Sequence, residues 1–207
     1  MSASREFASE ALQHAATSLP IELGGKTVML DAHAYSDGVD QLVVLLHRAA
    51  DICSDHIPIV RIHSGCVTGD IFHSLRCDCR QQLQAALQTI CDCPYGALVY
   101  LPYHEGRGIG LFRKLKTYAL QDCGLDTIEA NLAIGAPVDA RDFTLASRAL
   151  ADLGMRDVRL LTNNPLKETA LSGLGIRVVE RVPLRVLANP HNERYLETKR
   201  LRMAHDC

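Results

Sequence analysis

The chain has 207 residues, of which 47% are hydrophobic and 22% charged, and its 22 lysine and arginine residues against 24 aspartate and glutamate residues give a net charge of −2. So much apolar mass excludes a disordered chain, and the balanced charge gives no overall field that would attract nucleic acid or an anionic membrane. The longest aliphatic run covers only residues 42–46, whereas a membrane helix needs about 20 apolar residues. The first twenty residues also lack the basic start and apolar stretch of a signal peptide. We therefore expect a cytoplasmic protein whose eight cysteines are reduced and are either inert core residues or metal ligands.

Short apolar strands alternate with amphipathic helices along most of the chain. Residues 1–19 hold few large apolar side chains, so we expect them to form an arm or a helix outside the main domain. Apolar runs predict strands at residues 27–30, 41–47, 57–63, 97–101, 158–161 and 176–179. Helical spacing predicts helices at 81–93, 111–122 and 143–153, one that begins at Pro165, and a terminal helix at 193–204. This alternation predicts one α/β domain over residues 20–207, a layered sandwich with a mixed central sheet flanked by helices.

Three cysteines, Cys66, Cys77 and Cys79, lie close together in a polar stretch. Two cysteines separated by one residue can reach one metal from a turn, and a third completes a three-thiolate set. Soft thiolates favour zinc, and three protein ligands leave a fourth position open, which is typical of catalytic zinc.

Two alternatives to this zinc site remain open. Cys77 and Cys79 could join Cys91 and Cys93 in a closed structural site, although an intervening helix would hold the two pairs roughly 20 Å apart. The thiols could also be buried and inert.

Four short segments carry weaker signals for a ligand. Residues 24–27 suggest a P-loop, but the glycine that this motif needs five residues earlier is absent, so we reject it. Residues 105–110 lack dinucleotide spacing, but they suit either a phosphate, at a helix N-terminus, or a plain glycine turn. Residues 139–142 alone are typical of an exposed first helical turn capped by Asp142. Residues 162–167 end a strand and begin a helix, which is where ligands collect in α/β sheets.

Taken together, these segments resemble GTP cyclohydrolase II over about residues 20–205. The strongest likeness is Arg-Ile-His-Ser-Gly-Cys-Val-Thr-Gly-Asp at 61–70, followed by Ser-Leu-Arg-Cys-Asp-Cys-Arg-Gln-Gln-Leu at 74–83. The other matching segments are 105–111, 118–122, 126–131, 139–143, 161–167 and 181–199. So many motifs in one order make an accidental likeness improbable.

The resemblance implies the first step of riboflavin biosynthesis, in which GTP and water give 2,5-diamino-6-ribosylamino-4(3H)-pyrimidinone 5′-phosphate, formate and pyrophosphate. It also implies a homodimer, one Zn²⁺ per subunit held by Cys66, Cys77 and Cys79, and Mg²⁺ on the triphosphate. By motif matching, GTP would be contacted by Arg61, Ile62, His63, Ser64, Gly65, Gln82, Glu105, Gly106, Arg107, Thr127, Thr162 and Lys167.

Three further residues receive catalytic roles by the same matching. Tyr118 would assist at the ring, although its helical spacing alone predicts packing in the core. Asp139 would be the proton acceptor, and Arg141 the nucleophile towards the α-phosphorus. A guanidinium stays protonated below a pH of about 12 and is therefore a poor nucleophile. We favour Arg141 as a clamp on the α-phosphate, with water as the attacking group.

One departure from the family pattern stands beside the proposed zinc set, because Gly65 occupies a position that is usually glutamate. We hypothesise that Gly65→Glu would raise turnover if the site is a weakened version of the usual one. The alternative is a specialised paralogue that acts on GTP or a related guanine nucleotide and stops at a formamidopyrimidine. A zinc-bearing nucleic-acid module is disfavoured by the net charge of −2 and by only ten Phe and Tyr residues.

Overall fold

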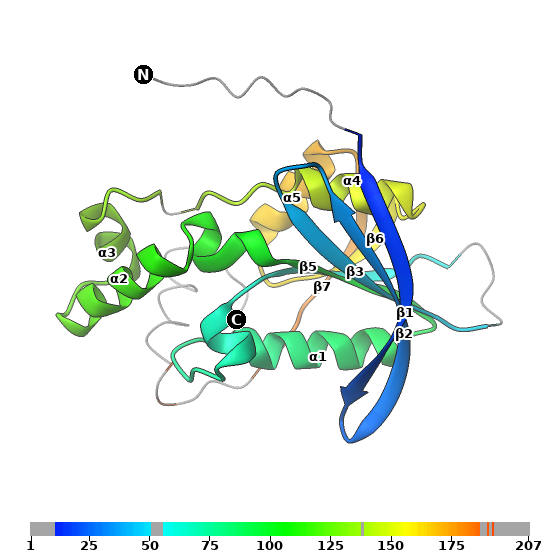
Figure 1. The fold of residues 1–207 in the computed structure, drawn as a ribbon, viewed down its shortest axis with the longest axis horizontal. Helices are drawn as coiled ribbons and strands as arrows, with labels where there is room; N and C mark the ends of the chain where they lie inside the picture. The colour runs from blue at the N-terminus through cyan, green and yellow to red at the C-terminus, as the bar shows by residue number, and fades with distance from the viewer. Residues whose placement is uncertain (1–10, 51–55, 138, 187–189, 191, 193–207) are drawn as a thin grey trace.

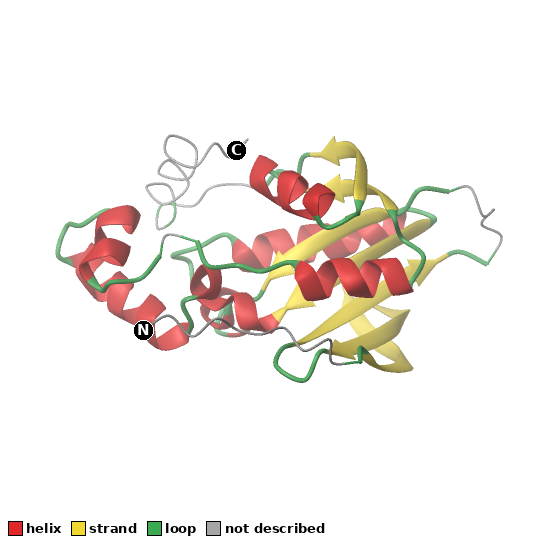
Figure 2. Ribbon diagram, turned by 90° about the horizontal axis from the view of Figure 1, so that it is seen from above, coloured by secondary structure: helices red, strands yellow, loops and turns green. Residues whose placement is uncertain are grey.

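The protein folds around a seven-stranded mixed sheet with the strand order β1-β2-β3-β5-β4-β6-β7 (Figure 1). The computed structural model describes residues 11–50, 56–137, 139–186, 190 and 192. Helices α4 and α5 lie on one face of the sheet and α1 on the other, while α2 and α3 extend beyond one end (Figure 2). The predicted α/β class, with a mixed central sheet flanked by helices, is therefore confirmed.

The elements have the following bounds. The strands are β1 (Gln13–Leu23), β2 (Lys26–Ser36), β3 (Gln41–Arg48), β4 (Ile59–Ser64), β5 (Tyr95–Leu101), β6 (Asp157–Leu161) and β7 (Arg177–Val182). The α-helices are α1 (Cys79–Asp92), α2 (Leu111–Asp122), α3 (Thr127–Ala133), α4 (Thr144–Asp152) and α5 (Pro165–Gly173). A π-helical turn, η1 (Val67–Ile71), and a 3₁₀ segment, η2 (Pro102–Gly108), follow β4 and β5. Within the described ranges, no helix has the length and apolar character needed to cross a bilayer.

The sheet changes from antiparallel to parallel at its centre. Strands β1, β2, β3 and β5 pair antiparallel, whereas β5, β4, β6 and β7 pair parallel. Ser64, at the end of β4, lies opposite Leu101, at the end of β5. Because β4, β5 and β6 end at the same edge, the segments that follow them are brought together there, as in other open α/β sheets.

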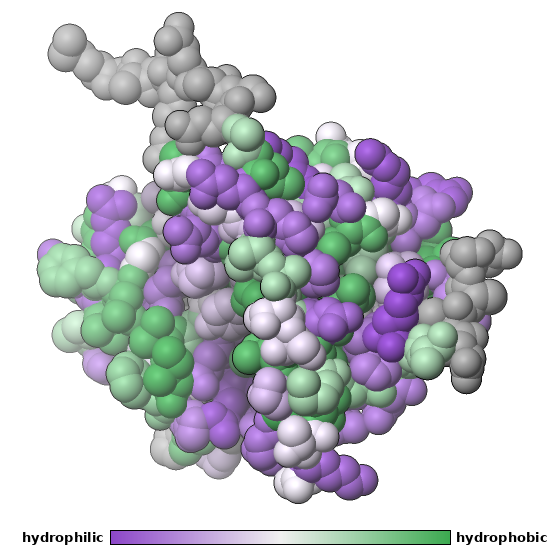
Figure 3. Space-filling view, turned by 45° about the vertical axis from the view of Figure 1, so that its right-hand side comes forward, coloured by the Kyte–Doolittle hydropathy of each residue, from purple (hydrophilic) through white to green (hydrophobic). Residues whose placement is uncertain are grey.

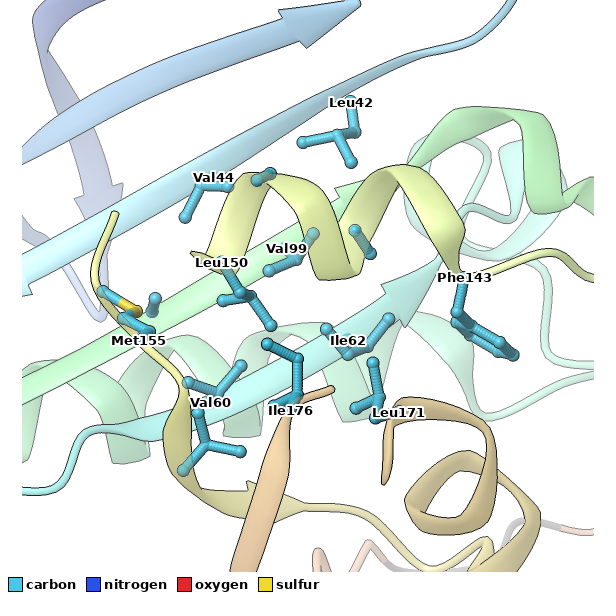
Figure 4. Packing of buried hydrophobic residues seen from close by; sticks show 14 of the residues in the cluster. Leu42, Val44, Val60, Ile62, Val99, Phe143, Leu150, Met155, Leu171 and Ile176 are labelled. Atoms are coloured by element: carbon cyan, nitrogen blue, oxygen red, sulfur yellow. The ribbon is translucent and has the colours of Figure 1, made fainter. Parts of the chain in front are cut away.

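The core fills both sides of the central strands. Residues 59–63 of β4 are all buried, as expected for a parallel strand covered on both faces. On one face, β3, β4 and β5 pack against α4 and α5 through a large apolar cluster that includes Leu150 (Figure 4). On the other face, Ile59 packs in a second cluster with Ala86 and Ile90 of α1. These two layers hold the carboxyl ends of the strands in fixed positions.

The predicted strands and internal helices are confirmed with shifts of a few residues at their ends, and α3 was not predicted. The expected helix within residues 1–19 is wrong where it can be compared, because residues 13–23 form β1 and pair along their whole length with β2. The expected domain boundary at residue 20 therefore falls inside a strand. Strand β1 is almost entirely exposed, so backbone pairing holds it and its side chains carry no apolar periodicity. Residues 1–10 and the predicted helix at 193–204 lie outside the described residues.

Candidate active site and metal centre

A cavity of about 320 Å³ opens at the carboxyl edge of β4, β5 and β6. Most of the residues predicted for the site line it: Arg61, His63, Ser64, Gly65, Cys66, Cys77, Cys79, Gln82, Gly106, Arg107, Tyr118, Asp139, Arg141, Thr162 and Lys167. These residues come from segments up to about a hundred positions apart in the chain, and the parallel strands bring them together. Tyr118 lines the cavity, so the prediction that it packs in the core is wrong.

Three of the predicted residues are not part of this lining as described. Ile62 is buried in the core, and its carbonyl oxygen accepts a 2.9 Å hydrogen bond from Lys167 Nζ. Glu105 is also buried, and its carboxylate accepts from the backbone N–H of Val67 at 2.6 Å. Thr127 begins α3, and its side chain lies outside the part of the structure described. Glu105 thus ties two loops together instead of facing the cavity.

The sulfur atoms of Cys66, Cys77 and Cys79 lie within 4.8 Å of one another. The Cys66 and Cys77 sulfurs are 3.7 Å apart, and tetrahedral zinc with Zn–S bonds of about 2.3 Å requires a spacing of about 3.8 Å. The donor set therefore fits zinc. Unbroken helix α1 places Cys91 about 18 Å from Cys79 at the helical rise. The closed site that included Cys91 and Cys93 is therefore wrong.

Gly69 closes the π-helical turn η1 directly over the three cysteines. A Cβ atom at this position would lie 2.8 Å from Cys77 Sγ and 3.1 Å from Cys66 Sγ. The backbone N–H of Gly69 also donates to Cys66 Sγ at 3.3 Å. The turn can approach the sulfurs this closely only because residue 69 has no side chain.

The three thiols differ in acidity in this arrangement. Hydrogen bonds from Cys77 and Cys79, together with the nearby Lys114 ammonium, lower the pKa of the Cys66 thiol. Hydrogen bonds to Cys66 and Cys77, together with burial, raise the pKa of Cys79. Since metal binding requires thiolates, a metal would release protons from this cluster.

Sequence reasoning missed two buried charged residues behind the cysteines. Asp70 accepts hydrogen bonds from the Cys66 backbone N–H at 3.0 Å and from the Tyr100 hydroxyl at 2.9 Å, and His63 Nε2 lies 3.2 Å away. Lys114 is only 8% exposed and donates to Cys66 Sγ at 2.9 Å. Burial acts to lower the pKa of Lys114, but the nearby Tyr118 and the hydrogen bond to Cys66 raise it overall. The sequence held one signal for Lys114, which is its position three residues after Leu111 on the same face of the predicted helix. A lysine on a face that packs against the protein is rarely buried without a partner.

The opposite wall is formed by the loop that carries Asp139 and Arg141. The backbone N–H of Ala140 donates to the Arg107 carbonyl at 3.0 Å, and a Cβ on Gly108 would lie 2.9 Å from the Ala140 carbonyl oxygen. Gly108 also has a φ of +87°, which favours glycine. The prediction that Asp142 caps the helix is wrong by one residue, because Phe143 is the N-cap of α4 and has no side-chain capping bond. Asp142 lies just before it, and its carboxylate accepts from the Thr144 backbone N–H at 2.8 Å.

Asp139 and Arg141 form a two-bonded ion pair at the cavity. Burial acts to raise the pKa of Asp139, but the Arg141 hydrogen bonds lower it overall. The carboxylate therefore stays ionised, and it stabilises the positive charge on the Arg141 guanidinium. A cation held this way suits phosphate binding better than nucleophilic attack.

Arg61 and Lys167 place two more cationic side chains at the carboxyl ends of the strands. Arg61 donates to the Leu161 carbonyl at 3.0 Å and to the Gln82 amide oxygen at 2.5 Å. Burial lowers the pKa of Arg61 to about 10, so the side chain remains charged at neutral pH. Its Nε atom has no hydrogen-bond partner among the described residues. Both residues line the cavity, where an anionic ligand would add to their contacts.

Gly65 lies against the end of β5. Its backbone N–H donates to the Leu101 carbonyl at 2.9 Å, and a Cβ would lie 3.0 Å from that oxygen and from Pro102 Cα. The backbone next to the first cysteine is therefore too close to the neighbouring strand for a side chain to fit without movement.

In the described part of the chain, three cysteine sulfurs and several cationic side chains converge inside one cavity, which is typical of an enzyme active site. The chain belongs to the GTP cyclohydrolase II family, whose sequence profile matches residues 13–183. This family consists of hydrolases.

Curated relatives agree with this assignment. The chain is 55% identical over 148 residues to riboflavin biosynthesis protein RibBA of Mycobacterium ulcerans, which covers 72% of this chain and 35% of the relative. It is 53% identical over 156 residues to the RibBA protein of Nocardia farcinica, which covers 75% of this chain and 38% of the relative. The chain thus matches little more than a third of the length of these relatives.

Gly69→Ala should strip metal from the cluster, because the added methyl group overlaps the sulfur positions. When both proteins are loaded with Zn²⁺ and dialysed, we expect the variant to retain less than half as much zinc as the wild-type chain, measured by elemental analysis. Gly173→Ala is the matched control, since a Cβ there meets nothing within 4 Å. Equal zinc in Gly69→Ala and wild type would contradict the tight closure of η1.

Gly65→Ala should reduce the free energy of unfolding by about 1–3 kcal/mol, as overpacking does. Gly65→Glu meets the same obstacle, so we expect it to lose activity, the reverse of the expectation from the sequence. Chemical denaturation of both variants beside Gly173→Ala tests this. Wild-type stability in Gly65→Ala would show that β5 moves aside easily.

His104 should make stability depend on pH, because it is buried and joins two walls of the cavity. Its Nε2 donates to the Asp142 carbonyl at 2.8 Å, and Ser64 Oγ lies 3.3 Å from Nδ1. Burial lowers its pKa from 6.5 to about 4. The unfolded chain therefore binds this proton first, and the folded state loses stability as the pH falls below 6.5.

The loss from His104 amounts to roughly 2 kcal/mol between pH 7 and pH 5. In His104→Gln, which cannot titrate, this part of the loss is absent. We expect the stability advantage of the wild type over His104→Gln to shrink by about that amount across the range, as measured by denaturation at each pH. A constant difference would mean that His104 has the same pKa in the folded and the unfolded chain.

Proposed function

We propose that the chain hydrolyses GTP to 2,5-diamino-6-ribosylamino-4(3H)-pyrimidinone 5′-phosphate, formate and pyrophosphate, as the first step of riboflavin biosynthesis. The observation that carries this proposal is the three-sulfur cluster, which shares one cavity with arginine and lysine side chains. Soft metal ligands suit hydrolysis at a carbon of the base, and fixed cations suit the triphosphate. The RibBA relatives carry the name of the same pathway.

Cys66, Cys77 and Cys79 would hold one Zn²⁺, and Mg²⁺ would accompany the triphosphate. Zinc, when bound, supplies a Lewis acid that activates water for the two cleavages at C8 of guanine. Tyr118 lines the same cavity as the three cysteines, and its ring lies 4.5 Å from the Arg76 guanidinium. We assign Tyr118 to proton donation as the formyl group departs.

The phosphate groups are assigned to the cationic walls of the cavity. Arg107 and Arg141 belong to two loops joined by the Ala140 hydrogen bond, so they can clamp one phosphate between them. Lys167, which is 6% exposed, adds a buried positive charge. Because Asp139 stabilises the charged form of Arg141, water is the better attacking group at the α-phosphorus, with Arg141 stabilising the charge that develops there.

The glycine at position 65, where the family pattern usually has glutamate, favours a second candidate. In a specialised paralogue, the absence of a carboxylate beside the metal would leave the second cleavage slow, and the formamidopyrimidine nucleotide would be the product. The substrate would then be GTP or a related guanine nucleotide.

We also propose a homodimer. Exposed apolar side chains occur on η1, on α2 and on α3, and hydrophobic surface gathers over α2 and α3 at the left of Figure 3. Phe72 and Phe112 are each 73% exposed. Exposed groups of this kind are typical of protein interfaces. A cytoplasmic location stays a prediction from the sequence.

Product analysis tests the function. The purified full chain is incubated with GTP and Mg²⁺, and its products are separated and identified by mass. We expect formate and the diaminopyrimidine in equal amounts, and no product from Cys79→Ser. Formamidopyrimidine alone would support the paralogue. Intact substrate after incubation with GTP, and with each related guanine nucleotide, would overturn both proposed functions.

A further inference from the structure

Lys114 is buried directly behind the cysteine cluster, although it belongs to none of the motifs that indicated the site. Its ammonium group donates to Cys66 Sγ at 2.9 Å, to Thr68 Oγ1 at 2.8 Å and to Glu105 Oε1 at 2.6 Å. An ammonium has three protons, so these three contacts use its full donor capacity. The nitrogen is therefore held at one position relative to the sulfur.

Glu105 holds this lysine in place from the opposite side. One carboxylate oxygen pairs with Lys114, and the other accepts from the Val67 backbone N–H, in the turn that follows Cys66. The first oxygen also accepts from the Gly106 N–H at 3.2 Å. The carboxylate thereby links the turn after β4, the segment after β5 and helix α2.

The buried ion pair between Lys114 and Glu105 contributes little to the stability of the fold. Both side chains of the pair are at most 10% exposed, and desolvating two charges often offsets their mutual attraction. A buried pair is therefore weak evidence for stability. The direction of the contact is informative, however, because the positive member faces the sulfur and the negative member faces backbone N–H groups.

A charge-assisted N–H···S hydrogen bond withdraws electron density from a thiolate. Three thiolates together carry more negative charge than a divalent metal carries positive charge. Their electron donation therefore weakens the metal as a Lewis acid. Hydrogen bonds to metal ligands counteract such donation and fix the orientation of the ligand.

We propose that Lys114, anchored by Glu105, is a positioning residue of the metal centre: it fixes the Cys66 sulfur and reduces the electron donation of that sulfur to the metal. This inference rests on the proposed function only in so far as the cysteines bind a metal. It gives Glu105 a role behind the site, in agreement with its position outside the cavity lining.

Cobalt substitution tests the proposal without GTP. The full chain is loaded with Co²⁺, and the sulfur-to-cobalt charge-transfer absorption in the near ultraviolet is recorded. Loss of the hydrogen bond raises the energy of the sulfur electrons, so Lys114→Met should move the band to longer wavelength. Lys114→Arg, which keeps the charge, should return the band towards the wild-type position. Lys116→Met, an exposed lysine on the same helix, should leave the band unchanged.

Lys114→Met leaves Glu105 buried without its cation and can fail to fold for that reason alone. The double variant Lys114→Met/Glu105→Gln removes both charges and keeps the shape, so it should show the same band shift in a folded protein. Turnover of GTP should fall roughly 10–100-fold in both variants, as is usual for residues that support metal ligands.

The outcomes separate this inference from the proposed function. A wild-type band position in the folded double variant would overturn the role of Lys114 while leaving the metal centre intact. A band shift without any GTP turnover in the wild type would support the role of Lys114 and contradict the proposed reaction. Absence of the charge-transfer band in the wild type would overturn both.

Discussion

The site depends on one constraint, which is that β4, β5 and β6 run in the same direction and end at one edge of the sheet. The segments that follow these strands are therefore neighbours in space, whatever their own sequences are. The cysteine turn follows β4, the glycine-rich segment follows β5, and the asparagine-capped helix follows β6. Two layers of helices bury the strands on both faces, so the positions of these ends are set by the core and not by the loops.

Close packing of the loop backbones, which glycines permit, completes the cavity at the edge of the sheet. Gly69 lets a turn close over the sulfurs, and Gly108 lets the loop of Asp139 and Arg141 lie against the glycine-rich segment. The net charge of −2 conceals this local organisation, because the relevant cations are few and converge on one cavity. A site assembled from such contacts is organised before any ligand arrives, which limits the reorganisation that binding requires.

Apolar patterning predicted the elements that form the core, because periodicity records burial. It could not predict β1, whose pairing with β2 uses backbone groups and leaves the side chains exposed. Motifs predicted the cavity-lining residues, including the three cysteines. They placed Glu105 at the ligand, whereas its contacts with Val67 and Lys114 are tertiary and have no signature in local sequence. The crowding around Gly65 likewise depends on the distance between two strands, which a single sequence does not contain.

The central claim is that Cys66, Cys77 and Cys79 form an open three-thiolate metal centre facing the cavity. X-ray absorption at the zinc edge of the purified full chain tests it most directly. We predict three sulfur neighbours at about 2.3 Å and one nitrogen or oxygen neighbour. Four sulfur neighbours, or zinc bound without sulfur, would contradict the claim.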